Sequence, residues 1–149
     1  MKQKSIITRI ISIAFALLFL YTSVSKMVDY SVFKEKISSS PLLEPAAGPL
    51  AWLLPGIELV VVVLLIIPRW RLRGLYMSFL LMILFTGYII ATAGSDEYLP
   101  CSCGGVLEKL SWKAHLLFNG IFIALALSGI QLERNINRKS KILLNSLLA

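Results

Sequence analysis

Four long apolar segments constrain the fold of this chain more than any other feature. They lie at about Ile6–Val24, Leu50–Ile67, Gly74–Ala93 and Trp112–Leu132. A helix needs about 20 mostly apolar residues to cross the hydrocarbon core of a bilayer. A helix satisfies its backbone hydrogen bonds within one segment, so a single apolar segment can cross lipid as a helix. The sequence therefore predicts an all-α fold, an integral membrane bundle of four antiparallel helices.

The overall composition agrees with a membrane protein and argues against a nucleic-acid-binding one. The 149 residues are 57% hydrophobic and only 15% charged, whereas soluble domains carry about 25% charged residues. The net charge is +7. The basic residues gather at the ends of the apolar segments, where membrane orientation requires them. We therefore expect membrane lipid, and no nucleic acid, as a partner.

The remaining sequence fits one domain with a short extension. Residues 1–133 form the predicted bundle, and residues 134–149 form a basic cytoplasmic tail. The apolar run Ile142–Leu148 is too short to span and is expected on the membrane surface. The loop Ser25–Gly48 contains a predicted interfacial helix, Tyr30–Ile37, which ends before Pro41 because the residue preceding proline avoids helical torsions.

The first apolar segment has an alternative interpretation as a cleaved signal peptide. Basic residues precede it, and the small residues Ser23 and Ser25 follow its apolar run. The run is long for a signal core, however, and its removal would leave an odd number of spans. We therefore favour a spanning helix.

The distribution of Lys and Arg predicts the orientation. Ten of the 15 basic residues lie at the N-terminus, in the turn Arg69–Arg73 and in the C-terminal tail; the two opposite loops hold the other five. The positive-inside rule then places both termini in the cytoplasm. We expect a multi-pass protein of the bacterial inner membrane, with the segment between the third and fourth helices in the periplasm.

That periplasmic segment contains both cysteines, Cys101 and Cys103. One residue separates them, so a disulfide between them would close a very small, strained ring, and strained disulfides are easily reduced and often catalytic. A staple without chemical use is a second interpretation, although small loops gain little from cross-linking. A metal site completed by His115 is a third, but it lacks a clear fourth ligand. We predict no metal.

Glu58 is an acid about eight residues inside the second segment. An intramembrane carboxylate is costly unless it is protonated or paired, and such acids are candidates for function. Lys26 ends the first helix on the outer side, and its long side chain could reach Glu58. A hydrogen bond that only fixes the bundle is the alternative role.

His115 and Asn119 lie four residues apart on the fourth helix and share one face. An imidazole near the cysteines could stabilise a thiolate or accept a thiol proton. The alternative is a pair of hydrogen bonds that pack helices. We prefer this alternative for Asn119, whereas for His115 both roles stay open.

Taken together, these motifs resemble a known family. The combination is Ser25-Lys26-Met27, Pro55-x-x-Glu58, Cys101-x-Cys103-Gly104, and Trp112 with Asn119. It is similar to the MauE branch of the DoxX-like membrane proteins, over nearly the whole chain as far as about residue 130. The chain departs from that pattern at Gly104, where Phe is common, and at Phe118, where Arg is common. We expect His115 to take over the polar role of that Arg.

The resemblance implies four transmembrane helices and a redox-associated role with a thioredoxin-like periplasmic partner. Our leading hypothesis is a thiol–disulfide oxidoreductase component in which Cys101 and Cys103 exchange with that partner. His115 and Lys26 would bias the thiolate, and Glu58 would relay a proton. A membrane quinone is the cofactor that distant relatives suggest, although the chain has no quinone motif. The rival hypothesis is a non-catalytic membrane subunit or assembly factor.

Overall fold

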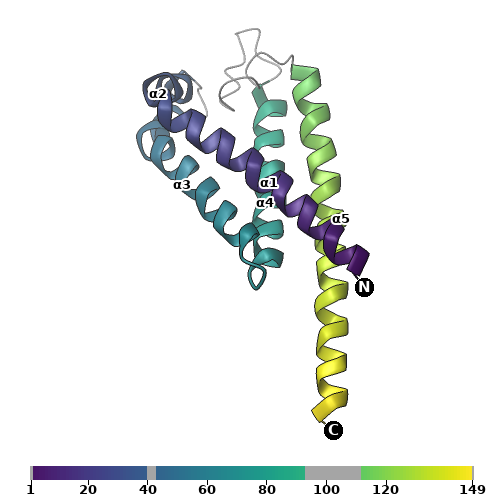
Figure 1. The fold of residues 1–149 in the computed structure, drawn as a ribbon. Helices are drawn as coiled ribbons and strands as arrows, with labels where there is room; N and C mark the ends of the chain where they lie inside the picture. Colours follow the sequence, from purple (N-terminus) through teal and green to yellow (C-terminus); the bar gives the residue numbers. More distant parts are fainter. Residues whose placement is uncertain (1, 40–42, 93–111, 149) are drawn as a thin grey trace.

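The computed structural model describes residues 2–39, 43–92 and 112–148, which form helices joined by short turns (Figure 1). No strand occurs among these described residues, so the predicted all-α class is confirmed. The elements in chain order are α1 (Lys2–Val28), α2 (Tyr30–Ser38), the 3-10 helix η1 (Glu44–Ala46), α3 (Ala47–Ile66), α4 (Arg71–Thr92) and α5 (Trp112–Leu148).

Four of these helices are long and apolar enough to cross a membrane. Successive spans run in opposite directions (Figure 1), so the predicted multi-pass antiparallel bundle is confirmed. The spans are Ser5–Val28, Glu44–Ile66, Arg71–Ala91 and Lys113–Ser146.

The four helices pack in a ring. Helix α1 contacts α3 and α5, and α4 contacts the same two helices from the other side. Phe15 and Phe19 of α1 are fully buried at the centre, and Phe15 meets the ring of Phe122 edge-on with centroids 5.1 Å apart. Helix α1 therefore supplies the middle of the core.

We name the two ends of the bundle from Figure 1. The upper end is where α2 lies and α5 begins, and the lower end holds the turn between α3 and α4. At the upper end, α2 packs on the start of α3 through Phe33 and Ile37, which bury against Ala47 and Ala51. The predicted interfacial helix is therefore present, and it caps one side of the bundle.

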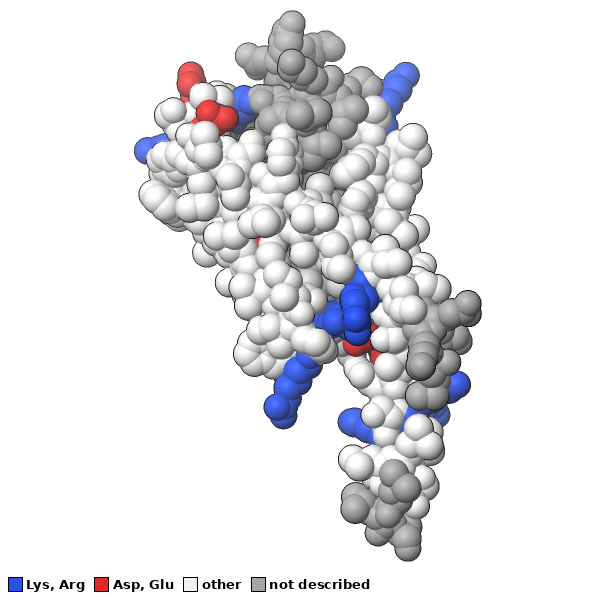
Figure 2. All heavy atoms as spheres, viewed as in Figure 1, with Lys and Arg blue, Asp and Glu red and all other residues white. Residues whose placement is uncertain are grey.

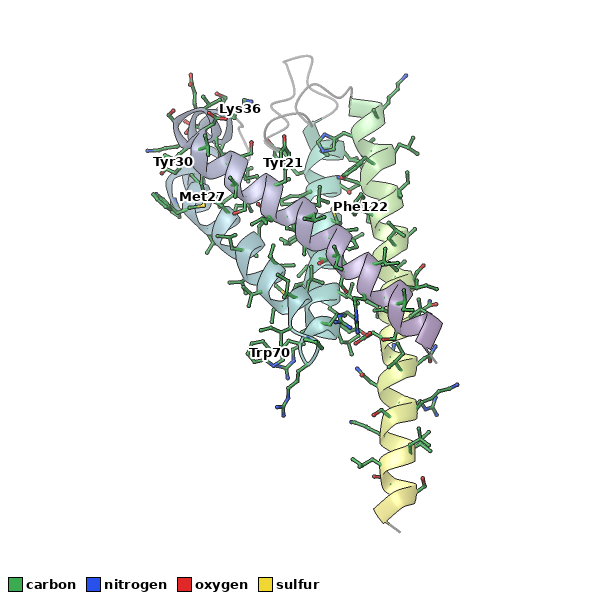
Figure 3. All side chains as sticks on the ribbon, viewed as in Figure 1. Tyr21, Met27, Tyr30, Lys36, Trp70 and Phe122 are labelled. Carbon is green, nitrogen blue, oxygen red and sulfur yellow. The ribbon has the colours of Figure 1, made fainter. Side chains whose placement is uncertain are left out.

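At the lower end, α3 and α4 approach closely at Gly74. A Cβ atom at this position would lie 2.9 Å from the backbone nitrogen of Leu65. Only glycine permits this approach without a shift of the backbone. Trp70 is exposed in the adjoining turn, at the opposite end of the bundle from Tyr30 of α2 (Figure 3).

The outer surface of the helices suits lipid. Large apolar side chains such as Leu17, Leu84 and Leu117 point outward. On the face shown in Figure 2, charged side chains gather towards the two ends, and the surface between them is nearly free of charge. In water such a surface would promote association, whereas in a bilayer it forms the contact with acyl chains.

Helix α5 continues well beyond the predicted fourth segment. The sequence places the end of that segment near Leu132, but α5 runs to Leu148 and projects past the lower end of the bundle (Figure 1). No glycine or proline interrupts residues 133–148, so nothing in this stretch breaks a helix. The predicted basic tail is thus, as far as Leu148, a continuation of α5.

Candidate functional site

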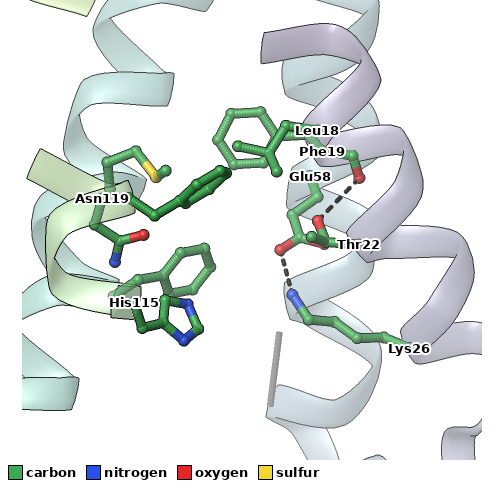
Figure 4. Close-up of a pocket in the computed structure, with 10 residues that line it drawn as sticks. Leu18, Phe19, Thr22, Lys26, Glu58, His115 and Asn119 are labelled. Atoms are coloured by element: carbon green, nitrogen blue, oxygen red, sulfur yellow. Dashed lines mark hydrogen bonds and ion pairs between the residues drawn. The ribbon is translucent and has the colours of Figure 1, made fainter. Parts of the chain in front are cut away.

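Four buried polar side chains meet in the upper half of the bundle. Lys26 comes from α1, Glu58 from α3, and His115 and Asn119 from α5, and each is at most 3% exposed. They line one small cavity of about 20 Å³, together with Thr22 and several apolar side chains (Figure 4). We call Lys26, Glu58, His115 and Asn119 the upper polar cluster. The structure thus brings together three of the five predicted site residues.

The register of α1 against α3 explains how Lys26 meets Glu58. The hydroxyl of Ser23 donates a hydrogen bond of 3.0 Å to the carbonyl oxygen of Pro55, and this bond ties the two helices together. Lys26 lies about one turn beyond Ser23, and Glu58 about one turn beyond Pro55. Because the helices run in opposite directions, these turns lead away from each other, and only a long side chain can close the gap.

The side chain of Lys26 is long enough to close the gap between α1 and α3. Its Nζ contacts Glu58 Oε1 directly, as a hydrogen bond and an ion pair (Figure 4). The same Nζ lies 5.7 Å from the ring centroid of Phe33 and 5.2 Å from that of Phe85. Aromatic faces attract a cation at these distances. The predicted pairing of Lys26 with Glu58 is therefore present, in a setting that holds the ammonium group from several sides.

Two polar atoms of the cluster have no hydrogen-bond partner among the described residues: Oε2 of Glu58 and Nδ1 of His115. Buried polar groups are nearly always satisfied by protein or by ordered water. A cavity needs at least about 10–15 Å³ to hold one water molecule, and this one offers about 20 Å³. The cavity can therefore hold one water molecule next to an acid and an imidazole.

Asn119 has a packing role in this structure. Its Nδ2 donates to Thr86 Oγ1 at 3.2 Å, and that hydroxyl donates to the carbonyl oxygen of Met82 at 2.6 Å. This chain of hydrogen bonds joins α5 to α4. It is the helix-packing role that we prefer for Asn119 from the sequence.

A second, larger cavity of about 310 Å³ lies beside the cluster, between α2, α3 and α4. Lys26 lines both cavities, so it stands at their junction. Apart from Lys26 and Tyr88, its walls are apolar: Phe33, Ile37, Leu43, Leu50, Leu54, Leu84, Phe85 and Ile89.

A second buried ion pair lies at the lower end and was not anticipated from the sequence. Arg71 Nη1 of α4 is 4.0 Å from Glu133 Oε1 of α5, and both residues are less than 10% exposed. Arg71 was counted only as one of the basic residues that set the orientation. The available signal was Glu133 itself, a single acid at the end of an apolar segment that needs a partner.

The two cysteines lie outside the described residues. The segment that contains Cys101 and Cys103 joins α4 to α5, and His115 lies in the first turn of α5. Within residues 2–39, 43–92 and 112–148, no three His, Cys, Asp or Glu side chains gather as a metal site would require. That observation does not extend to a site that includes the cysteines.

The fold and the buried cluster define a polytopic membrane protein with an acid, an amine and an imidazole inside its bundle. The family model described as methylamine utilisation protein MauE matches residues 4–132, and the chain therefore belongs to the MauE family. The match includes both cysteines and the whole upper polar cluster, and ends just before Glu133. No curated protein and no solved structure matches the chain. The wider DoxX-like grouping stays a prediction.

The departure at Phe118 is visible in the site. Phe118 lines the small cavity and packs on Phe122, with ring centroids 4.6 Å apart. An apolar wall thus stands at this position, and the polar groups that α5 places at the cavity are His115, one turn earlier, and Asn119.

Proposed function

We propose that this protein is a membrane thiol–disulfide redox protein that exchanges disulfides with a thioredoxin-like partner through Cys101 and Cys103. The observation that carries the proposal is the position of the upper polar cluster. The chain leaves the bundle at Thr92 and returns at Trp112, and the cysteines lie between these residues. The bundle end that anchors the cysteine segment thus has a buried acid, amine and imidazole.

The composition of the cluster supports chemistry rather than packing alone. A pair that only fixed two helices would not need a cavity beside it. Here Glu58 and His115 both line a cavity with space for one water molecule, and each has a buried polar atom without a partner among the described residues. Carboxylates and imidazoles in such settings transfer protons efficiently when their partners lie within hydrogen-bond reach or one water away.

The proposed exchange has two steps. The thiolate of one cysteine attacks the disulfide of the partner, a mixed disulfide forms, and one partner sulfur leaves as a thiolate. The thiolate of the second cysteine then attacks the mixed disulfide, closes the Cys101–Cys103 bond and releases the second partner sulfur. Two electrons pass to the partner, and the protons lost by the two cysteines end on its thiols. The reverse sequence oxidises the partner.

Each cluster residue has a role in this scheme. His115 accepts the thiol proton, and a positive charge near a thiol favours the thiolate. Glu58 holds the proton while the exchange proceeds and returns it through His115 to the partner's leaving thiolate, and Lys26 balances the charge on the carboxylate. Asn119 keeps α5 against α4, so that His115 stays at the cavity.

The larger cavity fits the head group of a membrane quinone. Ligand pockets begin at about 300 Å³ and are mostly apolar with a few polar groups, and this cavity has about 310 Å³ with Lys26 at its wall. Lys26 would donate a hydrogen bond to a carbonyl oxygen, and the apolar walls would hold the ring. In the reverse sequence, which leaves Cys101 and Cys103 as a dithiol, a bound quinone would accept the two electrons and two protons of that dithiol and become a quinol.

The orientation required by this function places the upper end outside the cell. It rests on the excess of Lys and Arg at the N-terminus, the lower turn and the tail. We expect a membrane-impermeant thiol reagent to label the reduced cysteines in intact spheroplasts. Labelling that appears only after the membrane is permeabilised reverses the orientation.

Mixed-disulfide trapping tests the function. We expect that Cys101→Ser or Cys103→Ser, whichever removes the resolving thiol, accumulates a covalent complex with a thioredoxin-like protein, visible as a band that disappears with reductant. The matched control is the variant in which both cysteines are replaced by serine, which should form no such band. If that double variant also complements a deletion fully, the protein is a non-catalytic subunit or assembly factor instead.

A further inference from the structure

A basic groove at the lower end has no part in the proposed redox site. It has a volume of about 550 Å³ and lies along the projecting part of α5, where it reaches the start of α4. Its lining comprises Leu72 of α4 and six polar or basic residues of α5: Gln131, Arg134, Asn135, Asn137, Arg138 and Lys141.

Among the residues that the structure describes, no acid pairs with the cations of this groove. Arg134, Arg138 and Lys141 are spaced by four and three residues, which places them on one side of the helix. Residues 134–149 contain no acid. Glu133 is the nearest acid in the sequence, but it is buried and its carboxylate faces Arg71 at 4.0 Å. The groove thus offers three cations, together with the amides of Gln131, Asn135 and Asn137, to an anion.

The position of the groove places it at the level of lipid head groups. Trp70, exposed at the lower end, is the kind of side chain that settles at the membrane–water interface. Leu72, two residues later, lines the groove. Figure 1 shows α5 projecting past the lower end of the bundle, and Figure 3 shows Trp70 at that end. The groove therefore begins at the level at which Trp70 is expected to meet the membrane surface.

The residues after the cations are apolar and exposed. Ile142, Leu143 and Leu144 follow Lys141 directly, and each is more than half exposed. An apolar end next to basic residues is the pattern of helices that bind at anionic membrane surfaces. Within the groove itself, Leu72 supplies an apolar wall at the start of α4, which suits the acyl end of a lipid better than a soluble anion.

We propose that this groove binds the head group of an anionic phospholipid from the leaflet at the lower end. The phosphate lies among Arg134, Arg138 and Lys141, the amides contact the polar part of the head group, and the acyl chains run along the apolar surface beside Leu72. Basic pockets between helices on the cytoplasmic side of membranes bind anionic head groups by this chemistry. This site does not depend on the redox proposal.

Native mass spectrometry of the full-length protein in mild detergent tests the site, with phosphatidylglycerol and phosphatidylcholine as probes. The test variant is Arg134→Gln/Arg138→Gln/Lys141→Gln. The control is Arg69→Gln/Arg73→Gln/Lys139→Gln, which removes three charges from the same end without touching the groove. We expect the wild type and the control to retain phosphatidylglycerol over phosphatidylcholine, and the test variant to bind it at least about tenfold more weakly.

Three results overturn the proposal. Equal losses in the test and control variants would mean that general surface charge holds the lipid. Unchanged binding in the test variant would mean that the groove is not the site. Complete displacement of the lipid by equimolar inorganic phosphate would mean that the groove takes free anions. If the triple variant does not fold, Arg138→Gln and Lys139→Gln form the same comparison, and only Arg138→Gln should weaken binding.

Discussion

The two buried ion pairs of this bundle differ in their surroundings more than in their chemistry. At the upper end, Lys26 contacts Glu58 directly, and both are almost completely buried. At the lower end, Arg71 and Glu133 are 4.0 Å apart, and each is slightly exposed. The upper pair adjoins two cavities. The lower pair borders neither of them and joins the first residue of α4 to the side of α5.

The comparison indicates that the surroundings of an intramembrane ion pair, rather than the chemistry of the pair, determine its role. A pair that is slightly exposed, such as Arg71 with Glu133, can fasten helices because water or lipid head groups can solvate it. A pair that is almost completely buried, such as Lys26 with Glu58, is costly to keep. It is therefore the better candidate for function, especially since it adjoins two cavities.

The largest expected effect is on stability. Glu58→Leu leaves the Lys26 ammonium buried without a counter-ion, which should lower the free energy of unfolding by about 3–5 kcal/mol. Lys26→Met/Glu58→Leu removes both charges and should recover most of that loss. Glu133→Leu should cost less, because Arg71 can turn towards water. Thermal unfolding in detergent measures all three, and equal losses for the two glutamate variants would remove the distinction between the pairs.

A second prediction separates stability from function. Glu58→Gln keeps an oxygen that accepts the hydrogen bond from Lys26, so the variant should fold. It cannot take up or release a proton, and function in the cell should fall by roughly a hundredfold, in the range of lost acid–base catalysis. Glu133→Gln is the matched control and should stay near wild-type activity. A fully active Glu58→Gln variant would make the acid structural only.

A third prediction concerns the packing that holds the lower end. Gly74→Ala places a Cβ against the backbone of Leu65 and should destabilise the protein by about 1–3 kcal/mol, as overpacking does. Gly87→Ala, where a Cβ meets nothing within 4 Å, should be neutral or slightly stabilising. The folded fraction of Gly74→Ala should retain its redox activity, because the upper polar cluster is untouched. A loss of activity beyond the loss of folded protein would contradict that separation.

The smallest expected effect is at Asn119. A double-mutant cycle with Asn119→Leu and Thr86→Val should give a coupling of about 0.6 kcal/mol, the average for hydrogen bonds between membrane helices. Neither single variant should change the exchange rate strongly. If Asn119→Leu reduces exchange as much as a substitution of His115, Asn119 belongs to the chemistry and not only to the packing.

The sequence predicts the spans of this fold well because apolar length is a local property. It also indicates the partner of Glu58, because an acid inside a segment requires one. It does not reveal the pair of Arg71 with Glu133, since both residues look like the ordinary charged ends of spans. The cavities were also beyond reach, because they depend on how Phe33, Phe85 and Phe118 pack between helices.

The length of α5 shows another limit of prediction from the sequence. Charge and the end of the apolar run suggested a separate tail after residue 133, but helix propensity carries α5 through Arg138 and on to Leu148. The groove forms because this continuation stays helical beside the start of α4. Its basic residues are visible in the sequence, although their arrangement around one cavity is not.

The central claim is that the upper polar cluster takes part in the redox chemistry of Cys101 and Cys103. The redox state of these cysteines in living cells tests it. Thiol trapping would measure the oxidised fraction in the wild type, in Glu58→Gln and in Glu133→Gln. We predict that the wild type and Glu133→Gln show the same fraction, and that Glu58→Gln accumulates one redox state. An unchanged fraction in Glu58→Gln, or cysteines that stay fully reduced in all three proteins, would contradict the claim.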